Sequence, residues 1–163
     1  MHIREAGIQD WDKIWPIFRE VVAAGDTYAY RRDTDKQEAL EIWLAKPRFT
    51  FVAEEDGEAL GTYYLKTNQG GPGSHVCNCG YMVSSAARGK GLATAMCEHS
   101  QKTARELGYL AMQFNFVAAT NNGAVRLWEK LGFSVVGTLP GAFEHPLHGY
   151  VDAFVMYKWL ESE

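Results

Sequence analysis

The sequence predicts a single domain of the mixed α/β class, in which helices pack against a sheet. Strand-like runs alternate with amphipathic helical segments in the order β-α-α-β-β-β-α-β-α-β-β. The chain has 163 residues, a length that suits one domain with a substantial core. Hydrophobic residues make up 47% of the chain, which excludes a disordered protein. No repeat, low-complexity tract or linker divides it, so we assign residues 1–163 to one domain.

The first half of the chain carries two helix signals and three strand signals. Ile14, Phe18 and Val21 recur at helical spacing, and Gly25 ends that segment. An Asp-Gly pair at 56–57 is a strong hairpin signal. The expected elements are a strand over 2–6, a helix over 10–24, an aromatic loop over 26–30, a helix from Asp35 to before Pro47, and a hairpin of strands 49–55 and 59–67.

The second half alternates strands with two further helices. Leu92, Met96 and Thr103 share one helical face, and Gly108 closes that helix. The expected elements are a loop over 68–74, a strand over 75–83, a helix over 92–107, a strand over 109–117, a helix over 123–131, strands over 134–137 and 151–160, and a long loop over 138–149 between these last two.

The most informative segment is the turn at 88–93, Arg-Gly-Lys-Gly-Leu-Ala, between an expected strand and an expected helix. Glycine allows backbone N–H groups to approach phosphate oxygens closely. The helix N-terminus adds a partial positive charge and unpaired N–H donors. The segment therefore indicates a pyrophosphate cradle. The alternative is a glycine-rich turn with two solvated cations.

Two motifs make the chain resemble the GCN5-related N-acetyltransferase (GNAT) superfamily. The pattern R-x-x-G-x-A, with Arg88, Gly91 and Ala93, resembles the acyl-CoA loop of that family. The segment 121–133 resembles its N-x-x-A-x-x-L-Y-x-x-x-G-F motif and follows at the spacing the family requires. The resemblance covers about residues 3–160. Within the superfamily, segments 74–81 and 114–121 resemble fungal acetyltransferases that act on L-azetidine-2-carboxylate and related proline analogues.

The resemblance implies a mixed, mostly antiparallel sheet whose parallel central strands, 75–83 and 109–117, splay apart. The cleft would take the pantetheine arm of acetyl-CoA like an added strand. It implies no metal. The residues that would bind the cofactor are Met82 and Val83 beside the arm, Arg88, Gly89, Lys90, Gly91, Leu92, Ala93 and Thr94 around the pyrophosphate, and Asn121 and Trp128 near the sulfur.

The implied activity is acetyl transfer from acetyl-CoA to the amine of a small molecule, such as an amino acid or a proline analogue, by direct attack in a ternary complex. The N–H of Val83 could stabilise the oxyanion. Many family members have a tyrosine acid at position 128, and Trp128 departs from that pattern because indole cannot usefully lose its proton. The alternatives are a protein or peptide N-acetyltransferase, and an acyl-CoA-binding module without turnover.

Three side chains are the candidates for catalysis. Asn121 could donate to the leaving thiolate, and it could equally be the N-cap of its helix. Asn78 lies in an apolar strand, where it could bind the substrate or be a hydrogen-bonded core amide. His75 is a candidate base because its ordinary pKa is near neutrality. Weaker candidates are Glu144, His145, His148 and Asp152, and the interpretation we favour is a water relayed by several groups.

The aromatic loop at 26–30 is expected to form the acceptor site. Tyr28 and Tyr30 could wall a small pocket, together with Asn78 as a substrate-binding residue. The alternative is that the two tyrosines cover the edge of the core.

Composition excludes several other classes of function. A formal charge of −4 and a pI of about 5.7 argue against a nucleic-acid binder. No apolar run is long enough to cross a membrane, and the N-terminus lacks a signal-peptide pattern. The three cysteines fit a reduced, cytoplasmic protein, and the Cys77-x-Cys79 pair lacks partners for a metal site. A homodimer through the final strands is possible in this fold.

Overall fold

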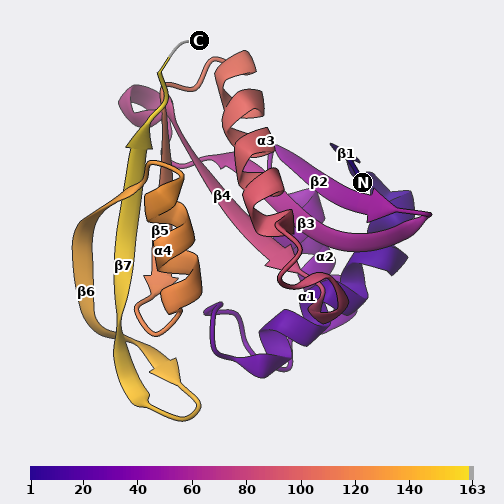
Figure 1. Ribbon diagram of the computed structural model, residues 1–163, viewed down its shortest axis with the longest axis horizontal. Helices are drawn as coiled ribbons and strands as arrows, with labels where there is room; N and C mark the ends of the chain where they lie inside the picture. Colours follow the sequence, from indigo (N-terminus) through magenta and orange to yellow (C-terminus); the bar gives the residue numbers. More distant parts are fainter. Residues whose placement is uncertain (162–163) are drawn as a thin grey trace.

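The computed structural model describes residues 1–161 and contains one seven-stranded sheet (Figure 1). The strand order is β1-β2-β3-β4-β5-β7-β6, and only the β4–β5 pair is parallel. The predicted α/β class, with a mostly antiparallel sheet and a parallel central pair, is therefore confirmed. The strands are β1 (His2–Glu5), β2 (Phe49–Glu55), β3 (Glu58–Thr67), β4 (Val76–Val83), β5 (Ala111–Ala118), β6 (Ser134–His145) and β7 (Gly149–Trp159).

Helices cover both faces of this sheet. Buried residues of α1, α2 and η2 form one cluster with Val52, Tyr64 and Met82 of the sheet. Buried residues of α3 and α4 form the other cluster with the opposite face. The helices are α1 (Trp11–Ala24), α2 (Lys36–Leu40), the π-helical turn η2 (Glu41–Ala45), α3 (Leu92–Glu106) and α4 (Asn122–Lys130), with short 3₁₀ turns η1 (Ile8–Asp10), η3 (Gly71–Gly73) and η4 (Ser85–Ala87).

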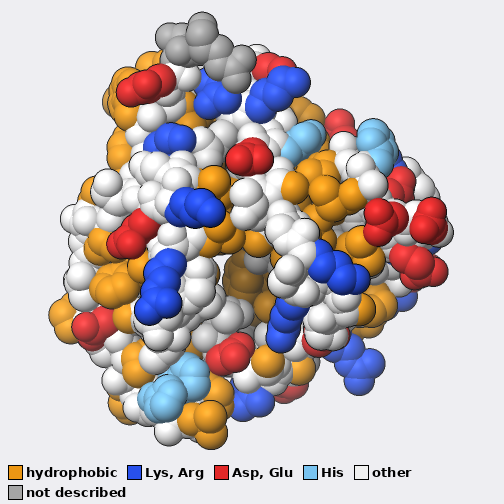
Figure 2. All heavy atoms as spheres, in the orientation of Figure 1, with side chains coloured by type: hydrophobic (Ala, Val, Ile, Leu, Met, Phe, Trp, Pro, Cys, Tyr) orange, Lys and Arg blue, Asp and Glu red, His pale blue; other side chains and the backbone are white. Residues whose placement is uncertain are grey.

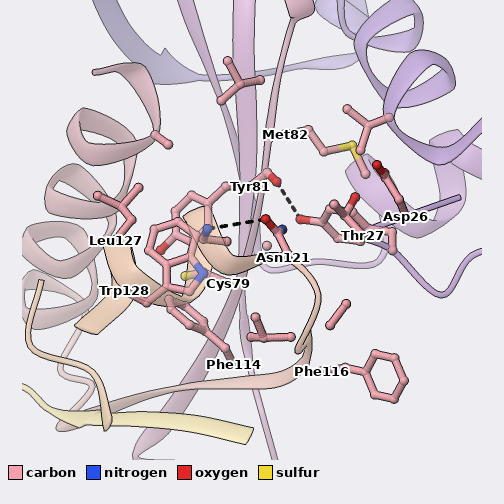
Figure 3. Close-up of a pocket in the computed structure, with 18 of the residues that line it drawn as sticks. Asp26, Thr27, Cys79, Tyr81, Met82, Phe114, Phe116, Asn121, Leu127 and Trp128 are labelled. Atoms are coloured by element: carbon pink, nitrogen blue, oxygen red, sulfur yellow. Dashed lines mark hydrogen bonds between the residues drawn. The ribbon is translucent and has the colours of Figure 1, made fainter. Parts of the chain in front are cut away.

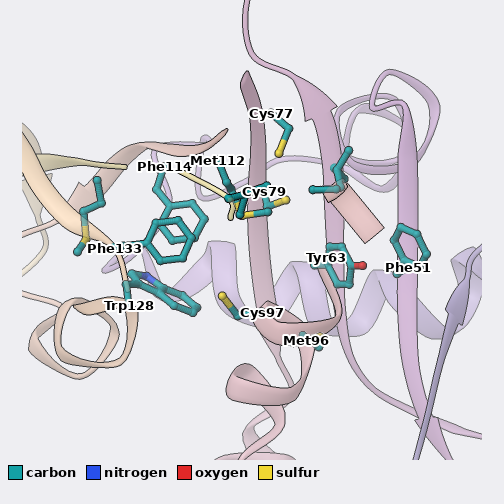
Figure 4. Packing of buried hydrophobic residues seen from close by; sticks show 14 of the residues in the cluster. Phe51, Tyr63, Cys77, Cys79, Met96, Cys97, Met112, Phe114, Trp128 and Phe133 are labelled. Carbon is teal, nitrogen blue, oxygen red and sulfur yellow. The ribbon is translucent and has the colours of Figure 1, made fainter. Parts of the chain in front are cut away.

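The cluster under α3 and α4 carries much of the aromatic core (Figure 4). The rings of Phe114 and Phe133 stack with their centroids 4.2 Å apart, and Trp128 lies tilted 5.2 Å from Phe114. The three cysteines are free and buried in this core. A core of this kind fixes β5 and α4 against each other, and both of them border the site described below.

Two predictions of secondary structure need correction. The expected long loop over 138–149 is wrong, because β6 continues to His145 and turns directly into β7 (Figure 1). Pro140 is tolerated there because β6 is an edge strand and its pairing with β7 is irregular between Leu139 and Phe143, so no regular ladder bond requires the missing N–H. The helix expected from Asp35 is α2 followed by η2, so its second half winds as a π turn.

Helix α1 positions the aromatic loop. Its buried side chains Ile14, Phe18 and Val22 are spaced by one helical turn and face the sheet. It ends at Gly25, whose φ of 70° is the left-handed conformation that commonly closes a helix. The chain therefore turns sharply into residues 26–30, over the end of the sheet where β4 and β5 separate.

No helix within residues 1–161 is long and apolar enough to cross a membrane.

Candidate functional site

The central feature of the site is the separation of β4 from β5. Parallel pairing between them ends at Asn78 and Gln113, although β4 continues to Val83. Beyond that point β5 has a bulge between Phe114 and Val117 in its pairing with β7. A bulge bends a strand and increases its local twist, which carries β5 away from β4. The predicted splay of the two strands is thus present, with Asn78 at the fork.

The register of β3 shows which backbone groups of β4 face the gap. Ser84 N–H donates to the carbonyl of Leu60 at 2.8 Å, and Thr62 pairs with Met82. Because hydrogen-bonded pairs alternate along an antiparallel ladder, Met82 directs its N–H and C=O toward β3. Tyr81 and Val83 direct theirs toward the gap. Val83 therefore suits the predicted backbone role, and Met82 can contribute only its side chain.

The glycine loop lies at the open end of this gap, before α3. Gly89 and Gly91 have φ values of 75° and 77°, which other residues adopt only with strain. Gly91 is the N-cap of α3 and has no side chain to cap it, so the first amides of the helix are left without intrahelical partners. Arg88 is exposed and lies 3.9 Å from Glu20 of α1. This is a positively polarised helix terminus with an exposed cation beside it.

A cavity of about 770 Å³ joins the gap, the glycine loop and the aromatic loop. Figure 2 shows the hollow near the middle of this face, and Figure 3 shows the side chains that line it. Of the predicted site residues, those that line the cavity are Tyr28, Tyr30, Asn78, Met82, Val83, Arg88, Gly89, Ala93, Asn121 and Trp128. Lys90, Gly91, Leu92 and Thr94 do not line it, although they belong to the adjoining loop and first helical turn.

Tyr28 reaches from the aromatic loop to the edge of β4. Its hydroxyl donates to the backbone carbonyl of Tyr81 at 2.7 Å, and its ring stacks on that of Tyr30 with centroids 5.6 Å apart. Gly80 permits this approach, since a Cβ there would lie 3.1 Å from the Tyr28 hydroxyl and 2.6 Å from Tyr64 Cε1. Tyr28 and Tyr30 both line the cavity and pack on the core cluster of α1, so the two interpretations of these tyrosines are compatible.

Asn78 is held on both sides of its amide. Its Oδ1 accepts from the hydroxyl of Tyr64 at 2.9 Å, and its Nδ2 donates to the carbonyl of Gln113 at 2.9 Å. With 4% of its surface exposed, it is a hydrogen-bonded core amide that ties β4 to β5 at the last paired position. These contacts support a positioning role for Asn78 at the fork.

Asn121 and Trp128 bring α4 to the other wall. Asn121 is the N-cap of the helix, and its Oδ1 accepts from the N–H of Ala124 at 3.4 Å. The amide Nδ2 is a donor that capping does not use. Trp128 is buried and its ring lies 5.1 Å from that of Tyr81. Asn121, in the turn that follows β5, and Trp128, within α4, both face the cavity (Figure 3).

The ionisable groups around the cavity are mostly tyrosines that stay protonated. Burial raises the pKa of Tyr28, Tyr64 and Tyr81 well above the ordinary value, and it raises the pKa of Tyr30 to about 12. These hydroxyls are donors rather than bases near neutral pH. Among the described residues that line the cavity, Asp26 is the single carboxylate, and none is a histidine.

His75 is not brought to the site. It is exposed and precedes the first residue of β4, and the centroid of its ring lies 6.1 Å from that of Trp159. Val83 stands at the other end of the strand, about 25 Å away at the rise of an extended chain. A base must be within hydrogen-bond reach, directly or through one water, so this geometry argues against His75 in that role. Glu144, His145, His148 and Asp152 also lie outside the cavity lining.

Sequence reasoning missed several residues that line the cavity. Tyr64 and Lys66 come from β3, Gly80 and Tyr81 from β4, and Asn115 from the bulge of β5. The signal for Gly80 was a glycine inside a strand, which often marks a close approach of another group. The two β3 residues carried no comparable signal, because only strand register shows that they meet Asn78 and Gly80.

The sheet has one splayed parallel pair of strands, and a glycine loop leads into a helix at the opening between them. This arrangement is typical of acyl-CoA-dependent transferases, and solved structures of this class resemble the chain. A GCN5-related N-acetyltransferase from Kribbella flavida is 44% identical, with a TM-score of 0.92 over 98% of this chain and 97% of that one. A putative acetyltransferase from Salmonella typhimurium, yncA, solved with its cofactor acetyl-CoA, has a TM-score of 0.87 over 100% of this chain and 95% of that one, and at 23% identity shows the fold alone.

The chain belongs to the acetyltransferase (GNAT) family, whose sequence profile matches residues 11–133. N-acetyltransferase aca1 from Schizosaccharomyces pombe is 39% identical over 97 residues, 59% of this chain. The chain spans about half the length of that curated relative, with 46% of it covered. The family predicted from the two motifs is therefore confirmed.

Among residues 1–161, no three His, Cys, Asp or Glu side chains lie together in a way that could hold a metal ion.

Proposed function

We propose that this protein transfers the acetyl group of acetyl-CoA to the amine of a small molecule, by direct attack in a ternary complex. The observation that carries the proposal is the continuity of one cavity, about 770 Å³ in volume, from the glycine loop through the β4–β5 gap to the aromatic loop. The donor and the acceptor can thus meet between the strands without a protein nucleophile. A structural relative, yncA, was solved with acetyl-CoA.

The gap and the glycine loop would hold the two ends of acetyl-CoA. The pantetheine arm would lie along the free edge of β4 in place of β5, and the N–H and C=O of Val83 would form hydrogen bonds with it. The pyrophosphate lies against the N–H groups of residues 89–94 at the start of α3, with Arg88 as a charge-assisted donor. Lys90 does not line the cavity, so we propose that its positive charge attracts the pyrophosphate without contacting it.

The reaction then needs oxyanion stabilisation and two proton transfers. The amine nitrogen attacks the thioester carbon, and the N–H of Val83 or Tyr81 stabilises the tetrahedral oxyanion. The C–S bond breaks, and the amide Nδ2 of Asn121 donates a hydrogen bond to the departing thiolate. The ammonium proton leaves through water to Asp26, the carboxylate at the cavity wall. Trp128 supplies shape to the sulfur pocket.

The acceptor site would lie on the side of the gap where Tyr28, Tyr30 and Asn78 meet. Rings from this loop would cover the apolar body of a small ligand. We propose an amino acid or a cyclic proline analogue, such as L-azetidine-2-carboxylate, as the acceptor. We also propose a cytoplasmic location, because three free cysteines suit a reducing compartment.

We propose a homodimer through β6, whose exposed Val135 and Val136 lie on the edge strand. Light scattering of the purified protein tests this state directly: a particle of one chain's mass contradicts it.

The test of function is mass spectrometry of reactions that contain acetyl-CoA and an acceptor panel. The panel holds L-azetidine-2-carboxylate, proline, hydroxyprolines, primary amino acids, polyamines and short peptides. Products bearing one acetyl group on the amino acids support the proposal. Acetylated peptides would instead identify a protein-modifying enzyme. Tight binding of acetyl-CoA without any product would identify a binding module.

A further inference from the structure

The two cations that line the cavity lie in different parts of it. Arg88 belongs to the glycine loop, whereas Lys66 extends from β3 beside the fork. Gly61 pairs with Val83 and Lys66 pairs with Asn78, so the two ends of this stretch are about 17 Å apart along the strand. Lys66, whose side chain is exposed, is therefore separate from the expected phosphate site.

Lys66 has no acidic partner. No carboxylate lies within ion-pair distance of its Nζ among residues 1–161. The ammonium instead lies 5.2 Å from the centre of the Tyr64 ring, an arrangement that stabilises a cation over an aromatic face. The ring is itself fixed, because its hydroxyl donates to Asn78 and its edge meets Trp43 at 87°. A positioned ammonium keeps its three N–H donors available to a ligand.

A row of hydrogen-bonded side-chain amides runs from β5 to the end of β3, the strand that carries Lys66. Gln113 Nε2 donates to Asn115 Oδ1 at 2.8 Å, and Asn115 Nδ2 donates to Asn68 Oδ1 at 2.7 Å. Asn68 follows Lys66 by two positions in the chain, and Asn115 lines the cavity from the bulge of β5. The Nδ2 of Asn115 retains a second hydrogen. Neutral donors beside an unpaired ammonium suit a small anion better than they suit a second cation.

The opposite sign occurs on the facing loop. Asp26 begins the aromatic loop that also carries Tyr28 and Tyr30, and all three line the same cavity. A ligand that carries a carboxylate at the Lys66 end and an amine toward the β4 edge matches both charges. A polyamine would place a second cation against Lys66.

We propose that Lys66, with Asn115, forms an anion subsite that binds the carboxylate of the acceptor, and so restricts acetylation to small amino acids. This inference rests on the proposed transferase function and assigns its acceptor specificity. Lys66 supplies the charge and Asn115 a directional N–H. The carboxylate bound at the fork orients the amine toward the cleft-facing amides of Tyr81 and Val83.

The experiment compares each amino acid with its carboxamide, which keeps the amine and removes the charge. The probes are L-azetidine-2-carboxylate, L-proline and L-alanine, each beside its amide, with wild-type protein, Lys66→Gln and Lys66→Arg. Lys46→Gln is the matched control, because Lys46 is exposed and lies outside the cavity. The readout is the ratio of kcat/KM for acid over amide, measured at saturating acetyl-CoA.

Wild-type protein and Lys46→Gln should prefer the acid at least tenfold, which one charge-assisted hydrogen bond can supply. Lys66→Gln should raise the KM for the acids about tenfold or more and bring the ratio near one, while Lys66→Arg retains part of the preference. A wild-type protein that acetylates acid and amide equally, or a Lys66→Gln variant with an unchanged ratio, overturns the subsite and leaves the transferase function standing. A wild-type protein that acetylates none of the six probes overturns the proposed amino-acid acceptor itself.

Discussion

Replacing Gly80 by alanine should disturb the acceptor side of the cavity specifically. The new Cβ would lie 2.6 Å from Tyr64 Cε1, 3.0 Å from its Cζ and 3.1 Å from the Tyr28 hydroxyl. Carbon atoms in contact are normally separated by about 3.5–4.0 Å, so the Tyr64 ring must move by roughly 1 Å. Overpacking of this size typically costs about 1–3 kcal/mol. The new Cβ would also crowd the Tyr28 hydroxyl and so disturb the hydrogen bond that this hydroxyl donates to the carbonyl of Tyr81.

The assay combines urea unfolding with acceptor kinetics. Gly80→Ala should lower the free energy of unfolding by about 1–3 kcal/mol and raise the acceptor KM, with a much smaller change in the Kd for acetyl-CoA. Gly137→Ala is the matched control in another strand, since its Cβ would meet only Val155 at an ordinary 3.9 Å. A Gly80→Ala protein with wild-type stability and wild-type acceptor KM would refute the close packing of the two tyrosines over β4.

Three further changes have definite expectations. Asn121→Asp keeps an N-cap acceptor but loses the Nδ2 donor. It should therefore slow acetyl transfer about tenfold or more in stopped-flow assays, with little loss of stability. If Asn121 only caps its helix, the variant should transfer at the wild-type rate. Arg88→Gln should weaken acetyl-CoA binding about tenfold at low salt, with the difference shrinking in high salt by calorimetry. Asp10→Asn should destabilise the fold by about 2–3 kcal/mol at neutral pH, because Asp10 is buried and accepts two hydrogen bonds from Arg4, at 2.8 and 3.0 Å.

The pH dependence of that last effect has a defined sign. The hydrogen bonds from Arg4 are the largest cause that lowers the pKa of Asp10 in the folded state. The unfolded chain therefore binds this proton more readily than the folded chain does. The stabilisation is present above the ordinary pKa of about 4 and is lost as pH falls below it. Unfolding curves of wild type and Asp10→Asn should converge in acid, and a constant difference down to the lowest pH would contradict this linkage.

Local signals predicted most of the fold. Ile14, Phe18 and Val21 gave the helical period of α1, and the Asp-Gly pair at 56–57 gave the β2–β3 hairpin. The 138–149 segment was misread because Pro140 and Gly141 normally interrupt strands. An edge strand accepts both residues, but the sequence does not show which strand lies at the edge.

The glycine-loop side of the cavity was more predictable than the side beside the fork of β4 and β5. A glycine loop before a helix is a contiguous signal, and it placed Arg88 and Gly89 correctly at the cavity. The side beside the fork depends on residues from β3, β4 and β5 that meet only through strand register. Lys66 is an example, because nothing local distinguishes it from other lysines. His75 shows the opposite problem. It is near the motif in sequence, but it precedes β4 at the end of the strand farthest from the glycine loop.

The most direct test of the central claim is a crystal structure of this protein with acetyl-CoA. The pantetheine arm should lie between β4 and β5, the pyrophosphate should contact the amides of residues 89–94, and the thioester oxygen should lie about 3 Å from the N–H of Tyr81 or Val83. A cofactor bound away from the gap, or a thioester oxygen with no backbone donor, would contradict the proposed catalytic site.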